Sequence, residues 1–166
     1  MKTYIMSIIV GVLFIIGCAR PATLPDIPNF RAVDATQTIY RGGQPNTNGF
    51  IYLKSIGISN IVKLNVESEG SDRFVKTLGM HMVYVPINKT EQLLGPLPHW
   101  KVNLAYSGIK PGTYVHCEHG QDRTGLIVAV YRMHRGMSKE DAKKEMLADG
   151  FHKVLHGLWD YFEDLP

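Results

Sequence analysis

The run from Thr113 to Gly125 constrains the fold of this chain more than any other stretch. Its first four residues are rich in β-branched and aromatic side chains, which predicts a buried strand that delivers Cys117 to a turn. Five residues then separate Cys117 from Arg123, and an apolar helical run begins at Thr124. A strand, a tight loop and a helix N-terminus in this order direct backbone N–H groups and the positive end of the helix at one point. The sequence therefore predicts an anion-binding loop that carries a thiol and a guanidinium.

The residue types in this loop suit a phosphate ester. Arg123 offers a planar guanidinium that can donate to two phosphate oxygens at once, and Gly120 permits a close approach of the backbone. The same positive field favours the thiolate form of Cys117, which is its nucleophilic form. We expect the loop to activate this nucleophile and to bind the substrate through the residues that follow it, namely Glu118, His119, Gly120, Gln121, Asp122 and Arg123.

The order His116-Cys117, five residues and Arg123-Thr124 resembles the signature of the cysteine-based protein tyrosine and dual-specificity phosphatases. The resemblance implies that Cys117 attacks phosphorus to form a phosphocysteine, which water then hydrolyses, while Arg123 clamps the phosphate. It also implies that the Thr124 hydroxyl eases departure of the thiolate and that His116 orients the surroundings of the cysteine. No metal or other cofactor is expected, because a metal held by the nearby histidines would consume the thiolate and would lack a fourth ligand.

The proton donor for the leaving group has three alternatives. In the tyrosine phosphatases it is an Asp on a separate upstream loop, but the corresponding stretch Tyr84–Glu91 contains no Asp. Asp122 is the first alternative, because it is placed like the Asp before the Arg in the myotubularin-like and Sac-like lipid phosphatases, and a phosphate dianion nearby would favour its protonated form. Glu91 is the second. In the third alternative, Asp122 is not the proton donor, and its carboxylate only forms hydrogen bonds with loop amides or with a neighbouring cation.

Outside this loop, short apolar runs alternate with helical patterns. Such β–α–β units predict an α/β fold with a central, mostly parallel sheet flanked by helices and with ligands at the carboxyl ends of the strands. The resemblance at the Cys117 loop implies that this fold is dual-specificity phosphatase-like. Residues Ile87–Pro98 show no clear period and are expected to form a mobile loop over the site. Trp100 and Leu104 are expected to anchor the next helix. The expected strands are Phe30–Val33, Thr38–Tyr40, Ile58–Asn65, Met80–Pro86 and Thr113–His116.

A turn near the start of the expected domain contains Arg41 and Gln44 followed by a proline. It is similar to the "RxxQP" turns that open the catalytic domain of many small dual-specificity-like phosphatases. By that resemblance, Arg41 is expected to bind the substrate and Gln44 to support the phosphate pocket. The alternative is an ordinary turn whose arginine is a solvated surface charge.

The N-terminus resembles a bacterial lipoprotein signal. The apolar run Ile5–Ile16 is shorter than the about 20 residues that span a bilayer, and it leads to Gly17-Cys18-Ala19, which is similar to the box whose Cys is diacylated. We expect a signal peptide over residues 1–17, a lipid-anchored tether over 18–29 and a phosphatase domain over 30–166. The expected location is the periplasmic face of a membrane, and Ala19 favours the outer membrane. The alternative is an ordinary signal peptide in which Cys18 is incidental.

Composition limits the partners. The chain has 166 residues, which suits one catalytic domain, and a formal net charge of +3 with no block of Lys and Arg, so no nucleic-acid partner is expected. The expected partners are a phosphorylated substrate and a membrane reached through lipid on Cys18, and the chain is expected to be a monomer. The second cysteine, Cys117, cannot pair with a lipidated Cys18, so no disulfide is expected.

Three functions are compatible with these residues, and a fourth, an RNA 5′-triphosphatase, fits them less well. The leading hypothesis is a metal-independent phosphomonoester hydrolase that acts on phosphotyrosine or a comparably exposed phosphate. An inositol phosphate or phosphoinositide phosphatase is the alternative, because the loop around Cys117 is similar to that of the cysteine-based phytases; however, Glu118 and Asp122 complement a polyphosphorylated ring poorly. RNA 5′-triphosphatases share part of the loop pattern, but an exported protein would rarely meet that substrate. A different class is a phosphate-binding module without turnover.

Overall fold

The computed structural model describes residues 27–34, 36 and 38–166. The expected signal peptide, Cys18 and most of the expected tether lie outside these residues. The last part of that tether is described, and it packs on the domain: Ile27 is buried beside Phe50 and Leu53, and the carbonyl oxygen of Pro28 accepts a hydrogen bond from Gly43 N at 2.6 Å. The packed domain therefore includes Ile27 and begins before the expected boundary at residue 30.

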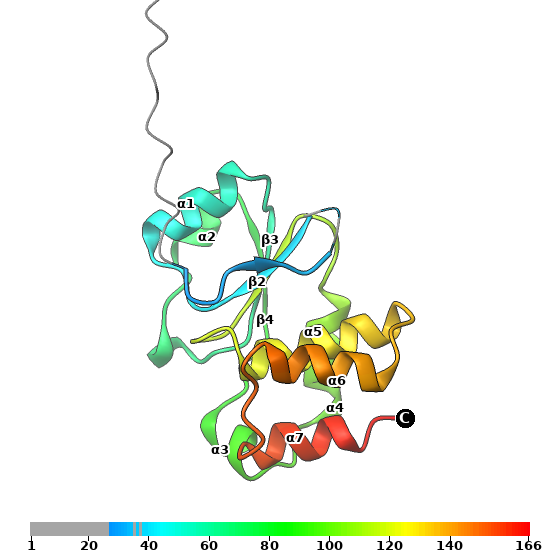
Figure 1. The fold of residues 1–166 in the computed structure, drawn as a ribbon. Helices are drawn as coiled ribbons and strands as arrows, with labels where there is room; N and C mark the ends of the chain where they lie inside the picture. The colour runs from blue at the N-terminus through cyan, green and yellow to red at the C-terminus, as the bar shows by residue number, and fades with distance from the viewer. Residues whose placement is uncertain (1–26, 35, 37) are drawn as a thin grey trace, which may run out of the picture.

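The centre of the domain is a five-stranded sheet in the order β1-β2-β5-β3-β4 (Figure 1). The pairs β2–β5, β5–β3 and β3–β4 are parallel, and β1 pairs with β2 in the antiparallel sense. This arrangement confirms the predicted α/β fold with a mostly parallel sheet. The strands are β1 Arg31–Ala32, β2 Ile39–Gly42, β3 Asn60–Lys63, β4 His81–Tyr84 and β5 Thr113–His116.

Strand β5 lies in the middle of this sheet, and all four of its residues are buried. In register, its last residue His116 stands between Gly42 of β2 and Lys63 of β3, so three parallel strands end at the same edge. Cys117 follows directly at that edge. The parallel topology thus places the cysteine where ligands bind in such sheets, as the sequence predicts.

Helices cover both faces of the sheet (Figure 1). The helices α1 and α2 pack on one face through a core cluster that includes Phe50 and Val75, and the larger cluster under α4 to α7 includes Val102, Leu126 and Phe162. Among the described residues, no helix is long and apolar enough to cross a membrane. The bounds are α1 Thr47–Ser55, the 3₁₀ helix η1 Glu67–Glu69, α2 Phe74–Thr77, α3 Lys89–Leu93, α4 His99–Ser107, α5 Asp122–His134, α6 Lys139–Ala148 and α7 His156–Glu163.

Two local expectations are wrong. The stretch expected as a mobile loop contains α3, which begins with a capping box: Asn88 Oδ1 accepts from Glu91 N at 3.0 Å, and Glu91 Oε2 accepts from Asn88 N at 2.9 Å. The Asn-x-x-Glu spacing is a known start signal for a helix, so the information was present in the sequence. The helix expected around Trp100 and Leu104 exists as α4, but these side chains are 61 % and 45 % exposed, and α4 packs on the core through Val102 instead.

Candidate active site

The loop between β5 and α5 surrounds a buried cysteine. Cys117 is a free cysteine, and Gly120 N donates a hydrogen bond to its Sγ at 3.2 Å. Gly120 has a φ of +82°, and a Cβ at this position would overlap the backbone of Gly42 and Gly43 at the end of β2. Glycine is therefore required here, because the loop is pressed against the neighbouring strand in a backbone conformation that other residues rarely adopt.

Arg123 lies in the first turn of α5 and is held by two other segments. Its Nη1 donates to Glu69 Oε2 at 2.6 Å and to the carbonyl oxygen of Ile87 at 3.1 Å. Its Nε has no hydrogen-bond partner among the described residues, and its Nη2 is 3.8 Å from Glu118 Oε2. One edge of the guanidinium is thus fixed by the protein, while the other edge retains N–H donors for a ligand.

Arg41 does not line the pocket, and the expectation that it binds the substrate is wrong. Its Nη1 donates to Asp149 Oδ2 at 2.6 Å, and its Nη2 donates to the carbonyl oxygens of Gly120 and Gln121 at 2.9 and 3.4 Å. The guanidinium is therefore buried behind the catalytic loop, away from the pocket that opens over Cys117. Arg41 holds two carbonyl groups of the loop on the face that points away from Cys117. The backbone N–H groups of the loop can then point toward Cys117.

Behind the nucleophile, His116 belongs to a buried polar network. Its Nε2 lies 2.9 Å from Asp72 Oδ2, and its Nδ1 lies 3.3 Å from the carbonyl oxygen of Cys117. Both ring nitrogens face oxygen acceptors, an arrangement that suits a ring with two N–H donors. His116 is thereby fixed in position next to the cysteine.

The same network holds Gln44, which the sequence assigns a supporting role. Gln44 Nε2 donates to Asp72 Oδ1 at 2.8 Å, and Lys63 Nζ is 3.6 Å from that oxygen. Burial alone would raise the pKa of the Asp72 carboxyl, but hydrogen bonds from His116 and Gln44 and the charges of His116 and Lys63 outweigh it and lower the pKa below its usual value. Gln44 therefore holds Asp72 behind the loop and is not among the residues that line the pocket over Cys117.

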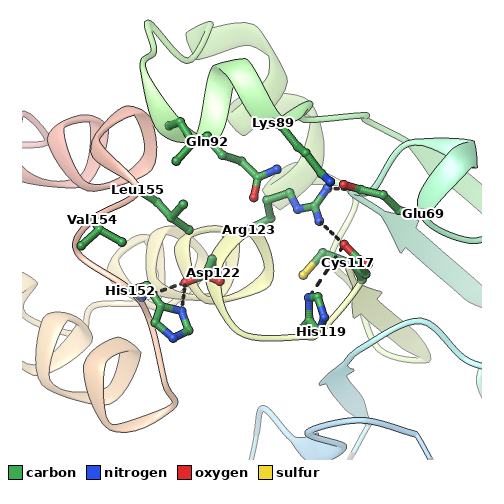
Figure 2. Close-up of a pocket in the computed structure, with 12 residues that line it drawn as sticks. Glu69, Lys89, Gln92, Cys117, His119, Asp122, Arg123, His152, Val154 and Leu155 are labelled. Carbon is green, nitrogen blue, oxygen red and sulfur yellow. Dashed lines mark hydrogen bonds and ion pairs between the residues drawn. The ribbon is translucent and has the colours of Figure 1, made fainter.

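A pocket of about 400 Å³ opens over Cys117 and Arg123 (Figure 2). Of the loop residues expected to bind the substrate, Gly120 and Gln121 do not line it: Gly120 contributes its N–H to the sulfur, and the side chain of Gln121 lies against Gly150. The residues that line the pocket are Glu69, Lys89, Gln92, Leu93, Cys117, Glu118, His119, Asp122, Arg123, His152, Val154 and Leu155.

The structure separates the two candidate acids. Glu91 is not in the pocket; besides capping α3, its Oε1 accepts from Lys101 Nζ at 2.6 Å, so its carboxylate is fully used and its expected role is wrong. Asp122 does line the pocket, and its Oδ1 accepts from His152 N at 2.8 Å and lies 3.0 Å from His152 Nδ1. The carboxylate of Asp122 is thus paired with a neighbouring histidine.

Thr124 is fully buried in the first turn of α5, and its hydroxyl has no hydrogen-bond partner among the described residues. An unpaired buried hydroxyl is unfavourable and calls for an explanation, of which a catalytic role is one. Within the same part of the chain, no group of three or more His, Cys, Asp and Glu side chains is arranged to hold a metal ion.

Comparison with known proteins identifies the family. Residues 22–156 match the sequence model of a family described as a DSP-PTPase phosphatase fused to NAD+ kinase. The chain belongs to this phosphatase family. The match covers the catalytic loop and every strand of the sheet, so the resemblance seen in the loop around Cys117 extends over the domain.

Proteins similar to this chain differ in the compounds that their names mention. The inositol diphosphatase DSP2 of Oryza sativa subsp. japonica is 28 % identical over 129 residues, which are 74 % of this chain and 63 % of the relative, so the chain spans less than two thirds of that protein. Two solved structures share the fold. The catalytic domain of the PP-IP phosphatase SIW14 from S. cerevisiae has a TM-score of 0.66, 20 % identity and coverage of 86 % of this chain and 88 % of that chain. TpbA of P. aeruginosa in complex with pTyr has a TM-score of 0.62, 21 % identity and coverage of 81 % and 88 %.

The sequence reasoning missed several residues of this phosphatase-family site. Glu69 and Asp72 follow β3 in a polar turn, and such a turn at the carboxyl edge of a parallel strand is the signal that could have pointed to them. Lys63 is a fully buried cation within that strand, where a charged residue needs a partner. Asp149 and His152 lie between α6 and α7, and no local pattern in the sequence marks them.

Proposed function

We propose that the chain is a cysteine-dependent phosphomonoester hydrolase that acts through a phosphocysteine. The observation that carries this proposal is the geometry of one pocket: the buried sulfur of Cys117 accepts from Gly120 N, and Arg123 keeps free donors beside it. The residues supply the nucleophile, the phosphate clamp and the anion-binding loop, so the chemistry requires no metal.

The reaction has two steps. The thiolate of Cys117 attacks phosphorus, the S–P bond forms, and the ester P–O bond breaks as the leaving oxygen takes a proton. Water then attacks the phosphocysteine, the S–P bond breaks, and inorganic phosphate and thiolate are released. Arg123 binds two non-bridging oxygens in both steps, and the unpaired hydroxyl of Thr124 donates to the departing sulfur.

The proposal is tested with the full chain in detergent and 4-nitrophenyl phosphate as the substrate. Cys117→Ser is expected to abolish turnover and to retain binding of inorganic phosphate, because the cradle remains while the nucleophile is lost. The matched control is Cys18→Ser, which makes the same chemical change outside the site and is expected to turn over like the wild type. Phosphate binding without any turnover by the wild type would instead establish the non-catalytic binding module.

A second candidate is a polyphosphorylated substrate such as an inositol phosphate, and Lys89 favours it. Lys89 lies on the rim of the pocket and forms no ion pair with any described residue, and His119 and His152 line the same rim (Figure 2). These groups could bind a second phosphate, and two similar proteins are named as phosphatases of inositol diphosphates. Glu118 on the same rim opposes this binding.

Direct competition separates the two candidates. The panel contains a phosphotyrosine peptide, a phosphothreonine peptide and inositol hexakisphosphate, each competing with 4-nitrophenyl phosphate. If the second candidate holds, Lys89→Met weakens competition by inositol hexakisphosphate and leaves competition by the phosphotyrosine peptide unchanged. Equal weakening of all three competitors would argue against a dedicated second phosphate site.

We also propose that the chain is an exported, monomeric lipoprotein with a diacylated Cys18, on the periplasmic face of a membrane and favouring the outer one. The support is the sequence around Cys18. At the start of the described chain, Asn29 Nδ2 donates to the carbonyl oxygen of His119 at 2.8 Å, so a tether that ends there would hold the pocket near the lipid. The test is the incorporation of labelled palmitate into the wild type and into Cys18→Ala. Labelling of the wild type that is lost in Cys18→Ala would support the lipid anchor, and equal labelling of the two proteins would exclude it.

A further inference from the structure

The segment between α6 and α7 is attached to the back and side of the catalytic loop. Asp149 accepts a hydrogen bond from Arg41 at 2.6 Å. Gly150 lies against the side chain of Gln121, and a Cβ added to Gly150 would overlap that side chain. His152 follows after one further residue and lines the pocket. The position of His152 is therefore set by the loop that holds the nucleophile, although the two are far apart in the sequence.

Asp122 fixes both the backbone and the ring of His152. The same oxygen, Oδ1, accepts from His152 N at 2.8 Å and lies 3.0 Å from His152 Nδ1 (Figure 2). These two contacts limit rotation of the ring and assign the Nδ1 hydrogen to the carboxylate. The other nitrogen, Nε2, has no hydrogen-bond partner among the described residues, and the side chain is 58 % exposed at the pocket.

We infer that His152 is the general acid of this site and that Asp122 is its positioning residue. This inference rests on the proposed phosphatase activity. The other carboxylates near the pocket are less suited to donate a proton: Glu69 is paired with Arg123 at 2.6 Å, Glu118 faces the same guanidinium at 3.8 Å, and Glu91 is outside the pocket. Histidine is the side chain whose ordinary titration lies nearest neutral pH, which suits a proton donor under these conditions.

The proposed step balances in both halves of the reaction. As the thiolate of Cys117 forms the S–P bond, the ester P–O bond breaks and the proton on His152 Nε2 passes to the leaving oxygen. The neutral ring then accepts a proton from the water that attacks phosphorus, and the S–P bond breaks to regenerate the thiolate. His152 is thereby protonated again for the next cycle, so no other proton source is required.

The experiment compares two substrates that differ in their need for a proton. The leaving group of 4-nitrophenyl phosphate departs readily as an anion, whereas that of phenyl phosphate benefits from protonation. In His152→Gln, kcat/KM for phenyl phosphate is expected to fall about 100-fold or more, the usual size of general acid catalysis, while kcat/KM for 4-nitrophenyl phosphate is nearly unchanged. Asp122→Asn is expected to give a smaller loss with the same substrate dependence, because the ring is then less well held.

The pH profile provides a second measurement. The decline of kcat/KM for phenyl phosphate on the alkaline side should disappear in His152→Gln and persist in the matched control His81→Gln, since His81 lies at the opposite end of a parallel strand. The titratable and charged groups that line the pocket with His152 are Asp122 and Arg123 on α5, Cys117, Glu118 and His119 on the loop, Glu69 on η1 and Lys89 on α3, and Lys153 is adjacent in the chain.

The outcomes are distinguishable. Equal losses on both substrates, or no loss on phenyl phosphate, would overturn the role of His152 while leaving the phosphatase activity intact. A loss on phenyl phosphate that only Asp122→Asn shows would make Asp122 the acid. Absence of Cys117-dependent turnover in the wild type would overturn the proposed function and this inference together. Because His152 is largely exposed, His152→Gln should keep the wild-type melting temperature, and His152→Asn serves as a second variant.

Discussion

Two arginines on opposite sides of the catalytic loop make a direct comparison. Arg41 and Arg123 are both buried, with 1 % and 3 % exposure, and each donates to a carboxylate at 2.6 Å, Asp149 for one and Glu69 for the other. The second terminal nitrogen, Nη2, differs between them. Arg41 Nη2 donates to two carbonyl oxygens of the loop, whereas the one ion-pair partner of Arg123 Nη2 within the described part of the chain is Glu118, at 3.8 Å, on the pocket.

The difference shows how one residue type performs two tasks. A guanidinium whose two terminal nitrogens both donate to the protein, as in Arg41, fixes the shape of the loop, and a guanidinium that keeps a terminal nitrogen for a pocket, as in Arg123, binds an anion. Sequence resemblance alone assigned both residues to substrate binding. We therefore expect substitutions of Arg123 to change activity and substitutions of Arg41 to change stability.

Among the variants that test this comparison, the largest change is expected from Arg123→Lys. The lysine keeps the positive charge and loses the planar pair of donors, so kcat/KM for 4-nitrophenyl phosphate should fall about 10²–10³-fold, as when one transition-state donor is removed. Steady-state kinetics and the melting temperature are measured together. A variant that retains nearly full activity would show that bidentate binding by Arg123 is not required.

Arg41→Met should act on the other side of the loop. It leaves Asp149 without its buried partner and two loop carbonyls without a donor, and the free energy of unfolding should decrease by about 3 kcal/mol; Arg31, 2.8 Å from Asp149, limits the loss. Chemical denaturation measures this change. If stability were unchanged while KM rose steeply, Arg41 would bind the substrate after all and the comparison would fail.

Asp72→Asn tests the network behind His116. The amide keeps the volume but loses the charge that His116 and Lys63 face, and we expect a loss of about 1–3 kcal/mol at neutral pH. Because the native pKa of Asp72 is lowered, its contribution is present above the ordinary aspartate value near 4 and disappears as pH falls through the lower native value.

Denaturation of the wild type and Asp72→Asn across this pH range measures that dependence. The two stabilities should differ most above pH 5 and should converge as the solution becomes more acidic. A difference that stayed constant down to pH 3 would mean that the charge of Asp72 does not stabilise the fold.

Thr124→Val should have the smallest effect. The hydroxyl has no partner among the described residues, so its loss breaks no hydrogen bond of the free protein, and the melting temperature should be nearly unchanged. If the hydroxyl bonds the departing thiolate, kcat should fall about tenfold, which corresponds to a bond of about 1.5 kcal/mol to a charged group. Rapid-mixing kinetics should then show a burst of 4-nitrophenol, and Thr124→Ser should restore the wild-type rate; a similar deficit in both variants would argue against the hydroxyl.

Much of the fold and the front of the site follow from local patterns. The strand, loop and helix around Cys117 were predictable because five residues between the cysteine and Arg123 can close only a tight loop, and apolar runs that alternate with helical patterns specify a parallel sheet. The helix α3 was missed although its Asn88–Glu91 capping box was visible, so that error came from relying on apolar periodicity alone.

What the sequence determined by itself is the nucleophile, the loop that follows it and the edge of the sheet at which both lie. Only the tertiary structure decided which charged or polar residue pairs with each residue of the site. These partners are far apart in the sequence. The pairs are Glu69 with Arg123, Asp72 with His116, Asp149 with Arg41 and His152 with Asp122, and their separations are 54, 44, 108 and 30 positions. Local spacing and side-chain periodicity specify a strand, a turn or a helix. They contain no information on which distant charges become neighbours, because that depends on how all the elements pack together.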